Sequence, residues 1–281
     1  MPTLRAVLPK GDAQTVPFVE VPLLRGSEGP NILRDWMRSK AKSLTAAQWA
    51  AVDLAIPSSC TILYIRLLFD RVSAWHSYDA PEELPSDVPG ILERFYDDLE
   101  HEYGAPMMRT FMRLLLTARA GLSIEALMDL LSADDEVLGG PGKPDTVFEF
   151  HEPPVRRLPP LVLTRVKRAF GDYIVERNAN GITVLGLYHR QFIEAGRRKY
   201  LPTAELRAAA SLALAEYFSG DAAVRFSTRN ITPQPLRHGS QPNMRRLHEL
   251  PTAFLGAGLV ARCAAEWYRR DSNPGLPPAI N

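Results

Sequence analysis

Apolar residues recur at helical spacing through most of the first 120 residues. Spacings of three and four residues place such side chains on one face of a helix. Thr45 and Gln48 fit a capping box, in which each side chain accepts a hydrogen bond from the other residue's backbone N–H. The segment 61–75 is apolar on nearly every side, so we expect it to be buried. The pattern predicts helices over residues 31–41, 45–57, 61–75, 91–103, 107–118 and 124–131.

The pattern changes in the third quarter of the chain. Two β-rich runs, 172–176 and 182–185, flank Asn180-Gly181. That pair suits a primed two-residue turn because both residues tolerate positive φ. We expect a proline-led helix before the hairpin and a helix that carries His189 in its first turn after it. A β-hairpin between two helices is the wing of a winged-helix domain.

The remaining segments add few strands. Residues 16–24 are predicted to form one strand flanked by prolines, and 133–158 a long loop rich in Gly, Pro and Asp. Helical spacing returns over 203–218, and after an irregular stretch again over 247–270, with a break near Gly256. The fold class predicted is therefore mainly α.

The amino-acid composition limits the classes of function that the chain can have. The hydrophobic fraction of 46%, charged fraction of 23% and net charge of +1 indicate a soluble globular protein with no overall field for nucleic acid or membrane surfaces. Cys60 and Cys263 are too far apart for a zinc knuckle or disulfide framework, which favours a reducing interior. The N-terminal residues lead us to expect no signal peptide, and no apolar run reaches the roughly 20 residues needed to span a membrane. We expect a cytoplasmic protein with no membrane partner.

The candidate catalytic motifs in the sequence lack residues that their chemistry requires. In the glycine-rich segment 139–144, Val137 stands where a phosphate-binding loop needs its first glycine, and Pro144 replaces the Mg²⁺-binding hydroxyl. The three His-Glu pairs lack the second histidine of a zinc-protease helix, and there is no Gly-x-Ser-x-Gly elbow. We expect no catalysis, no metal and no cofactor for this chain alone.

Residues 151–200 carry ten Arg and Lys against four acids. The candidate nucleic-acid contacts are Arg156, Arg157, Arg165, Lys167 and Arg168. The last three lie on the helix that enters a groove in DNA-binding winged helices. Packing of the same helix through its apolar residues is the competing interpretation.

His189 also has two interpretations. A helix N-terminus favours an anion, and a phosphate there would accept hydrogen bonds from His189 and from backbone N–H groups. On the residues alone, a partly buried histidine satisfied by the protein is the favoured interpretation.

Several motifs, taken in order, carry a family resemblance. They are Arg119-Ala-Gly-Leu-Ser-Ile-Glu-Ala-Leu127, Leu158-Pro-Pro-Leu161, Tyr188-His-Arg-Gln-Phe192 and Ala215-Glu-Tyr-Phe218. They resemble the lid and winged-helix region of NACHT-type STAND P-loop NTPases, closest to the NACHT–WD-repeat branch with telomerase-associated, nephrocystin-like and TANC-like proteins. Residues 43–48 and 63–68 are similar to the lid of that family.

The resemblance implies a regulatory module that is not itself an enzyme. In the family the winged-helix histidine contacts the β-phosphate of bound ADP and holds the closed, inactive state, and His189 would take that role. ADP or ATP would bind only together with an upstream nucleotide-binding domain, intramolecular or from a paralogue. Protein oligomerisation partners are a further expectation.

The resemblance also implies a division of the chain. Residues 1–24 would be a remnant of the nucleotide-domain edge, 25–105 the helical lid bundle, 106–202 the winged helix and 203–281 a helical tail. The phosphate-binding loop is not in the chain, and Ile62 stands where relatives have a lid proline. Two alternatives remain open: a winged-helix nucleic-acid or ribonucleoprotein-binding component that uses residues 156–168, and a helical interaction protein without a ligand.

Overall fold

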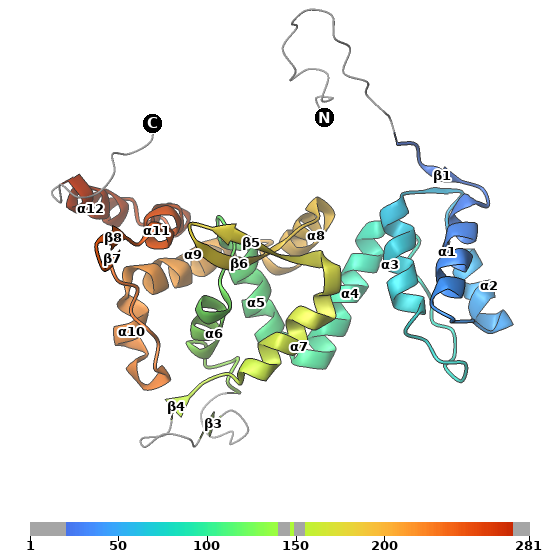
Figure 1. Cartoon of the computed structure of the whole chain (residues 1–281), viewed down its shortest axis with the longest axis horizontal. Helices are drawn as coiled ribbons and strands as arrows, with labels where there is room; N and C mark the ends of the chain where they lie inside the picture. Colours follow the sequence, from blue (N-terminus) through green and yellow to red (C-terminus); the bar gives the residue numbers. More distant parts are fainter. Residues whose placement is uncertain (1–20, 140–146, 149–154, 272–281) are drawn as a thin grey trace, which may run out of the picture. The chain divides into compact units, whose positions relative to one another are not determined.

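The computed structural model describes residues 21–139, 147–148 and 155–271. Contacts divide the chain into two units, Met1–Asp87 and Val88–Asn281. Helices predominate in the described part, and strands occur there only as two-stranded antiparallel pairs (Figure 1). The prediction of a mainly α fold is confirmed. None of the described helices is long and apolar enough to cross a membrane.

The first unit contains three helices in its described part. They are α1 (Glu28–Ser39), α2 (Ala46–Ala55) and α3 (Ile62–Val72), and β1 (Leu24–Arg25) pairs with β2 (Ser59–Cys60). The helices lie within a few residues of their predicted ranges. Most of the predicted strand 16–24 lies outside the described residues, and only Leu24 of its described part is in a strand.

Local hydrogen bonds explain where these helices begin. The N–H of Gln48 donates to Thr45 Oγ1 over 3.3 Å and the N–H of Thr45 to Gln48 Oε1 over 3.0 Å, which confirms the capping box. The buried Gln48 amide also donates to the carbonyls of His76 and Asp79, so one residue starts α2 and holds the loop after α3. Helix α3 is buried over most of its surface, as its apolar composition predicts, although Ile62 is exposed.

The second unit contains the winged-helix elements and the helices that follow them. In order these are α4 (Val88–Tyr103), α5 (Ala105–Thr117), α6 (Ile124–Ser132), β3 (Val147–Phe148), β4 (Val155–Arg156), α7 (Pro160–Phe170), β5 (Ile174–Ala179), β6 (Ile182–Leu187), α8 (Arg190–Tyr200), α9 (Ala204–Ser219), α10 (Asp221–Arg225), β7 (Arg237–His238), β8 (Gln241–Pro242), α11 (Met244–Gly256) and α12 (Val260–Asp271).

Strands β5 and β6 form the predicted wing. Asn180 and Gly181 turn the chain with φ of 57° and 81°, and the N–H of Gly181 donates to Asn178 Oδ1. Positive φ at both central residues is the signature of a type I′ turn, whose twist matches that of the paired strands. The predicted primed turn is therefore confirmed.

The turn between α5 and α6 pairs with the wing. Leu122 and Leu185 exchange two backbone hydrogen bonds of 2.8 and 3.1 Å. Gly121 has a φ of 84°, and a Cβ on it would lie 2.2 Å from the carbonyl oxygen of Leu185. Glycine is therefore required here, and this pairing fixes α5, α6 and the hairpin as one winged-helix arrangement.

Helix α4 packs with the winged helix. The buried Tyr96 hydroxyl donates to the carbonyl of Phe192 in α8 over 2.8 Å, and the Phe95 ring makes edge contacts with Phe170, Tyr173 and Phe192. These aromatic contacts place α4 in the second unit, so the division by contacts lies earlier than the boundary expected after residue 105.

Helix α11 packs against the same unit rather than extending from it. Glu249 is 2% exposed, and its two carboxylate oxygens accept the backbone N–H groups of Arg119 and Ala120, both over 2.9 Å. Arg245 Nη2 donates to the carbonyl of Gly121 over 2.6 Å, while Nη1 lies 3.0 Å from Glu249 Oε1 as an ion pair without hydrogen-bond alignment. The predicted irregular stretch 219–246 contains α10 and the start of α11.

Candidate functional site

His189 lies one residue outside helix α8 rather than in its first turn. It is the N-cap, with an extended backbone, and its Nδ1 accepts the N–H of Gln191 over 3.2 Å. The expectation that the helix includes His189 is therefore corrected by one position. An acceptor side chain at the N-cap satisfies a donor that the helix itself leaves unpaired.

This capping hydrogen bond determines which ring nitrogen of His189 can donate to a ligand. A ring nitrogen that accepts carries no proton, so neutral His189 carries its proton on Nε2. The side chain is half-buried and its neighbour Tyr188 is 74% exposed. The arrangement can donate a hydrogen bond to an anion at the positive end of the α8 dipole. The cap accounts for Nδ1, and the Nε2–H is the ring donor that this bond does not use.

The five basic candidates do not form one surface of equivalent cations. Arg157 forms an ion pair with Asp129 over 2.7 Å and donates to the carbonyls of Arg229 and Asn230. Arg156 is half-buried and donates to the carbonyl of Leu138. Both side chains therefore support the fold.

Helix α7 carries the other three candidates. Lys167 is paired with Glu176 of the wing strand β5. Arg165 and Arg168 are exposed. Of the five candidates, these two arginines present the guanidinium groups best placed for a nucleic-acid backbone, and that contact stays a prediction.

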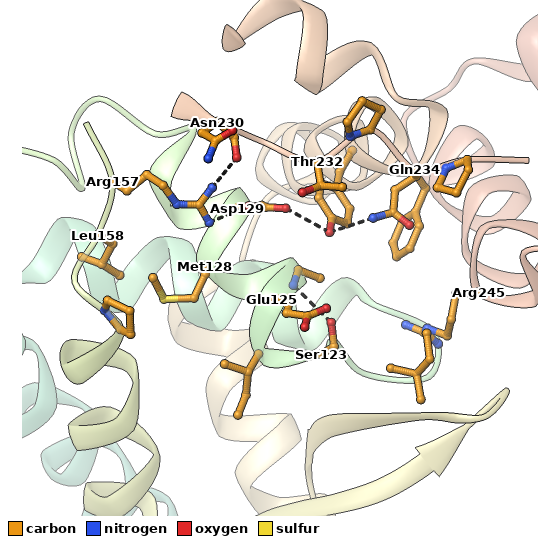
Figure 2. A pocket seen from close by; sticks show the side chains of 18 of the residues that line it. Ser123, Glu125, Met128, Asp129, Arg157, Leu158, Asn230, Thr232, Gln234 and Arg245 are labelled. Carbon is orange, nitrogen blue, oxygen red and sulfur yellow. Dashed lines mark hydrogen bonds and ion pairs between the residues drawn. The ribbon is translucent and has the colours of Figure 1, made fainter. Parts of the chain in front are cut away.

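A pocket of about 780 Å³ opens elsewhere in the second unit (Figure 2). Its walls come from α6, from the chain before α7, from the wing tip at Ile182, from α9 and from the segment before α11. The lining residues are Ser123, Ile124, Glu125, Ala126, Met128, Asp129, Val155, Arg157, Leu158, Pro160, Ile182, Tyr217, Phe218, Asn230, Thr232, Pro233, Gln234, Pro235, His238 and Arg245.

A hydrogen-bonded network forms the back of this pocket. The Tyr217 hydroxyl donates to Asp129 Oδ2 over 3.4 Å and accepts from Gln234 Nε2 over 2.9 Å, while Arg157 pairs with the other Asp129 oxygen. Burial raises the pKa of the Asp129 carboxyl, and the Arg157 guanidinium opposes that rise. Burial likewise raises the pKa of the Tyr217 hydroxyl. The network joins α6, α9 and the segment before α11.

The residue pattern along the chain does not predict this pocket. Its one local signal was Asp129, a carboxylate inside the apolar run Leu127-Met-Asp-Leu-Leu131, which requires a buried partner. The partners are 28 and 88 residues away, so spacing along the chain does not reveal them.

The glycine-rich segment 139–144 lies outside the described residues except for Gly139. No group of His, Cys, Asp or Glu suited to a metal ion occurs within residues 21–139, 147–148 and 155–271.

Comparisons with known proteins agree with the winged-helix arrangement. A family model described as "NWD1-like, winged helix-turn-helix domain" matches residues 83–207. NACHT domain- and WD repeat-containing protein 1 is 29% identical over 94% of this chain in Homo sapiens and 30% identical over 89% in Mus musculus. NACHT and WD repeat domain-containing protein 2 of Homo sapiens is 26% identical over 67% of the chain. No solved structure matches.

The chain spans only part of these relatives. It covers 17% of each protein 1 sequence and 11% of the human protein 2 sequence. The matched model begins before α4 and ends in α9, so it includes the α4 helix that contacts assign to the second unit. Residues 83–207 form a winged-helix domain that matches the NWD1-like model, in a chain similar over most of its length to NACHT and WD repeat-containing proteins.

Proposed function

We propose that this chain is a non-catalytic regulatory module of a NACHT-type signal-transduction NTPase. The winged helix closes over ADP bound to an upstream nucleotide-binding domain, and His189 contacts its phosphate. The first unit acts as the lid. A ligand held between two domains stabilises the closed state only by the contacts it makes there and loses on opening.

The observation that carries the proposal is the cap at the start of α8. The Gln191 N–H holds the imidazole of this half-buried residue through Nδ1, so the Nε2–H is the donor that would meet a ligand. A phosphate would meet both this donor and the positive end of an 11-residue helix. The resemblance to NACHT-type NTPases implies a nucleotide as the source of that phosphate, and the similarity to proteins named for a NACHT domain supports the resemblance.

Two substitutions of His189 test the phosphate contact. His189→Asn keeps a good N-cap and removes the imidazole, whereas His189→Ala removes both. In the chain joined to a complete nucleotide-binding domain, we expect each to weaken ADP binding by about tenfold to a hundredfold, the value of a hydrogen bond to a charged group. Isothermal titration with ADP measures this.

The pair of variants separates ligand binding from folding. Only His189→Ala should lower the unfolding free energy, by about 1 kcal/mol for a lost cap. Unchanged ADP affinity in both variants would refute the phosphate role of His189. If ADP affinity fell only in His189→Ala, the effect would come from the lost cap, and the proposal would also be wrong.

A further inference from the structure

The pocket beside α6 is a second site, separate from His189. None of its lining residues takes part in the α8 cap. Its volume of about 780 Å³ falls within the range of ligand pockets, which is about 300–1,000 Å³. It is built from the winged helix together with the segment between α9 and α11, which the matched family model does not include.

Charges inside the pocket are nearly all neutralised by the protein. Asp129 is paired with Arg157, and Arg245 with Glu249, a residue behind the pocket wall. Glu125 differs, since within the described residues it forms no ion pair with Lys or Arg, and its side chain is exposed. Figure 2 shows Glu125 in the part of the pocket that lies between Arg157 and Arg245. The four charged lining residues sum to zero, and among the described residues Glu125 is the one of them without an ion-pair partner.

Apolar side chains line the same pocket. Ile124 of α6 is 47% exposed and Ile182 of the wing is 40% exposed, and both line the pocket together with Met128 and Leu158. Single exposed apolar residues are ordinary on protein surfaces. Here two exposed apolar residues from separate elements line one pocket, and together they provide a surface for apolar groups of a ligand.

Polar groups at the rim suit a peptide backbone. Ser123 Oγ accepts the N–H of Ala126, so its own O–H is left to donate. The exposed Thr232 lies on the other wall. We propose that this pocket binds an extended peptide of a protein partner, in which a Lys or Arg side chain reaches Glu125 and flanking apolar side chains pack on Ile124 and Ile182.

A peptide array tests this proposal with the chain as it exists. The probes are capped hexapeptides with every apolar–Arg–apolar and apolar–Lys–apolar core, beside matched peptides with norleucine or Glu at the basic position. We expect a subset of the basic peptides to bind and their norleucine and Glu counterparts to bind at least tenfold more weakly. Fluorescence anisotropy of the best peptides gives the dissociation constants.

Substitutions locate the binding. Glu125→Gln should weaken the best peptide about tenfold, because a neutral acceptor makes a weaker hydrogen bond than a carboxylate. Ile124→Ser should weaken it as well. Glu136→Gln, an exposed glutamate outside the pocket lining, is the matched control and should change nothing.

Three outcomes would overturn the proposal. One is binding of the Glu peptides as tightly as the basic ones, and another is an affinity that Glu125→Gln leaves unchanged. The third is self-association of the chain that Ile124→Ser abolishes, because the surface would then be an interface between two copies. Circular dichroism checks that the variants are folded; both substituted side chains are exposed, so we expect no change.

Discussion

The charged residues of the second unit fall into two groups with opposite environments. Glu249, Arg245 and Asp129 are buried, and each is held by a partner distant in the chain or by backbone groups. Arg165 and Arg168 on α7 are exposed. The first group connects α9 and α11 with the winged helix, whereas the second faces solvent.

This contrast separates stability from recognition. A buried charge that loses its partner leaves an uncompensated ion, so its removal destabilises the fold. An exposed charge contributes little to stability and stays available to an external ligand. Net charge along residues 151–200 does not distinguish the two groups, because Arg157 and Arg168 count equally in the sequence.

The largest effect is expected at Glu249. Glu249→Ala leaves Arg245 buried without its ion-pair partner and removes the acceptor for the N–H groups of Arg119 and Ala120. We expect a loss of about 3–5 kcal/mol in unfolding free energy, as for other broken buried pairs. Urea denaturation of the whole chain measures it.

A double variant and a surface variant serve as controls. Arg245→Met with Glu249→Leu removes both charges and should cost less than Glu249→Ala alone. Glu194→Ala breaks an exposed i,i+4 pair with Arg190 and should cost about 0.5 kcal/mol or less. Equal effects of Glu249→Ala and Glu194→Ala would show that burial does not separate the two groups.

Interactions between near neighbours in the sequence were predictable. The capping box of Thr45 and Gln48 and the turn at Asn180-Gly181 each depend on residues at most three apart, and both formed as expected. The wing and the mainly α fold followed from such local signals. His189 was placed one residue too far into α8 because histidine is an unusual N-cap, and its Nδ1 acceptor role is visible only in the structure.

Long-range contacts were not predictable. Glu249 binds backbone groups about 130 residues earlier, and any residue type can supply a backbone N–H, so the sequence contains no sign of this partner. The same holds for Tyr217 with Asp129, 88 residues apart. The pocket and the packing of α11 depend on such contacts, whereas the cap at His189 does not.

An intermediate effect is expected at the back of the pocket. Asp129→Asn keeps the side-chain shape and removes the charge that faces Arg157, whose side chain is 24% exposed. Because Arg157 retains carbonyl partners and some contact with water, we expect a loss of about 1–3 kcal/mol, below that for Glu249→Ala. A double-mutant cycle with Arg157→Ala, measured by urea denaturation, gives the coupling of the pair. Additive single effects would mean that the ion pair does not hold this wall.

The smallest effect on stability is expected at the two exposed arginines. Arg165→Ala with Arg168→Ala should change the unfolding free energy by less than about 0.5 kcal/mol, since surface substitutions away from buried features are nearly neutral.

The same variant tests the nucleic-acid alternative, in which each neutralised phosphate adds about 0.9 to the log–log slope of duplex affinity against salt. Because Arg157 and Lys167 are already paired with acids of the same chain, we expect the unmodified chain to show no specific duplex binding. A slope of several units that falls by about 2 in the double variant would instead establish the exposed face of α7 as a nucleic-acid surface.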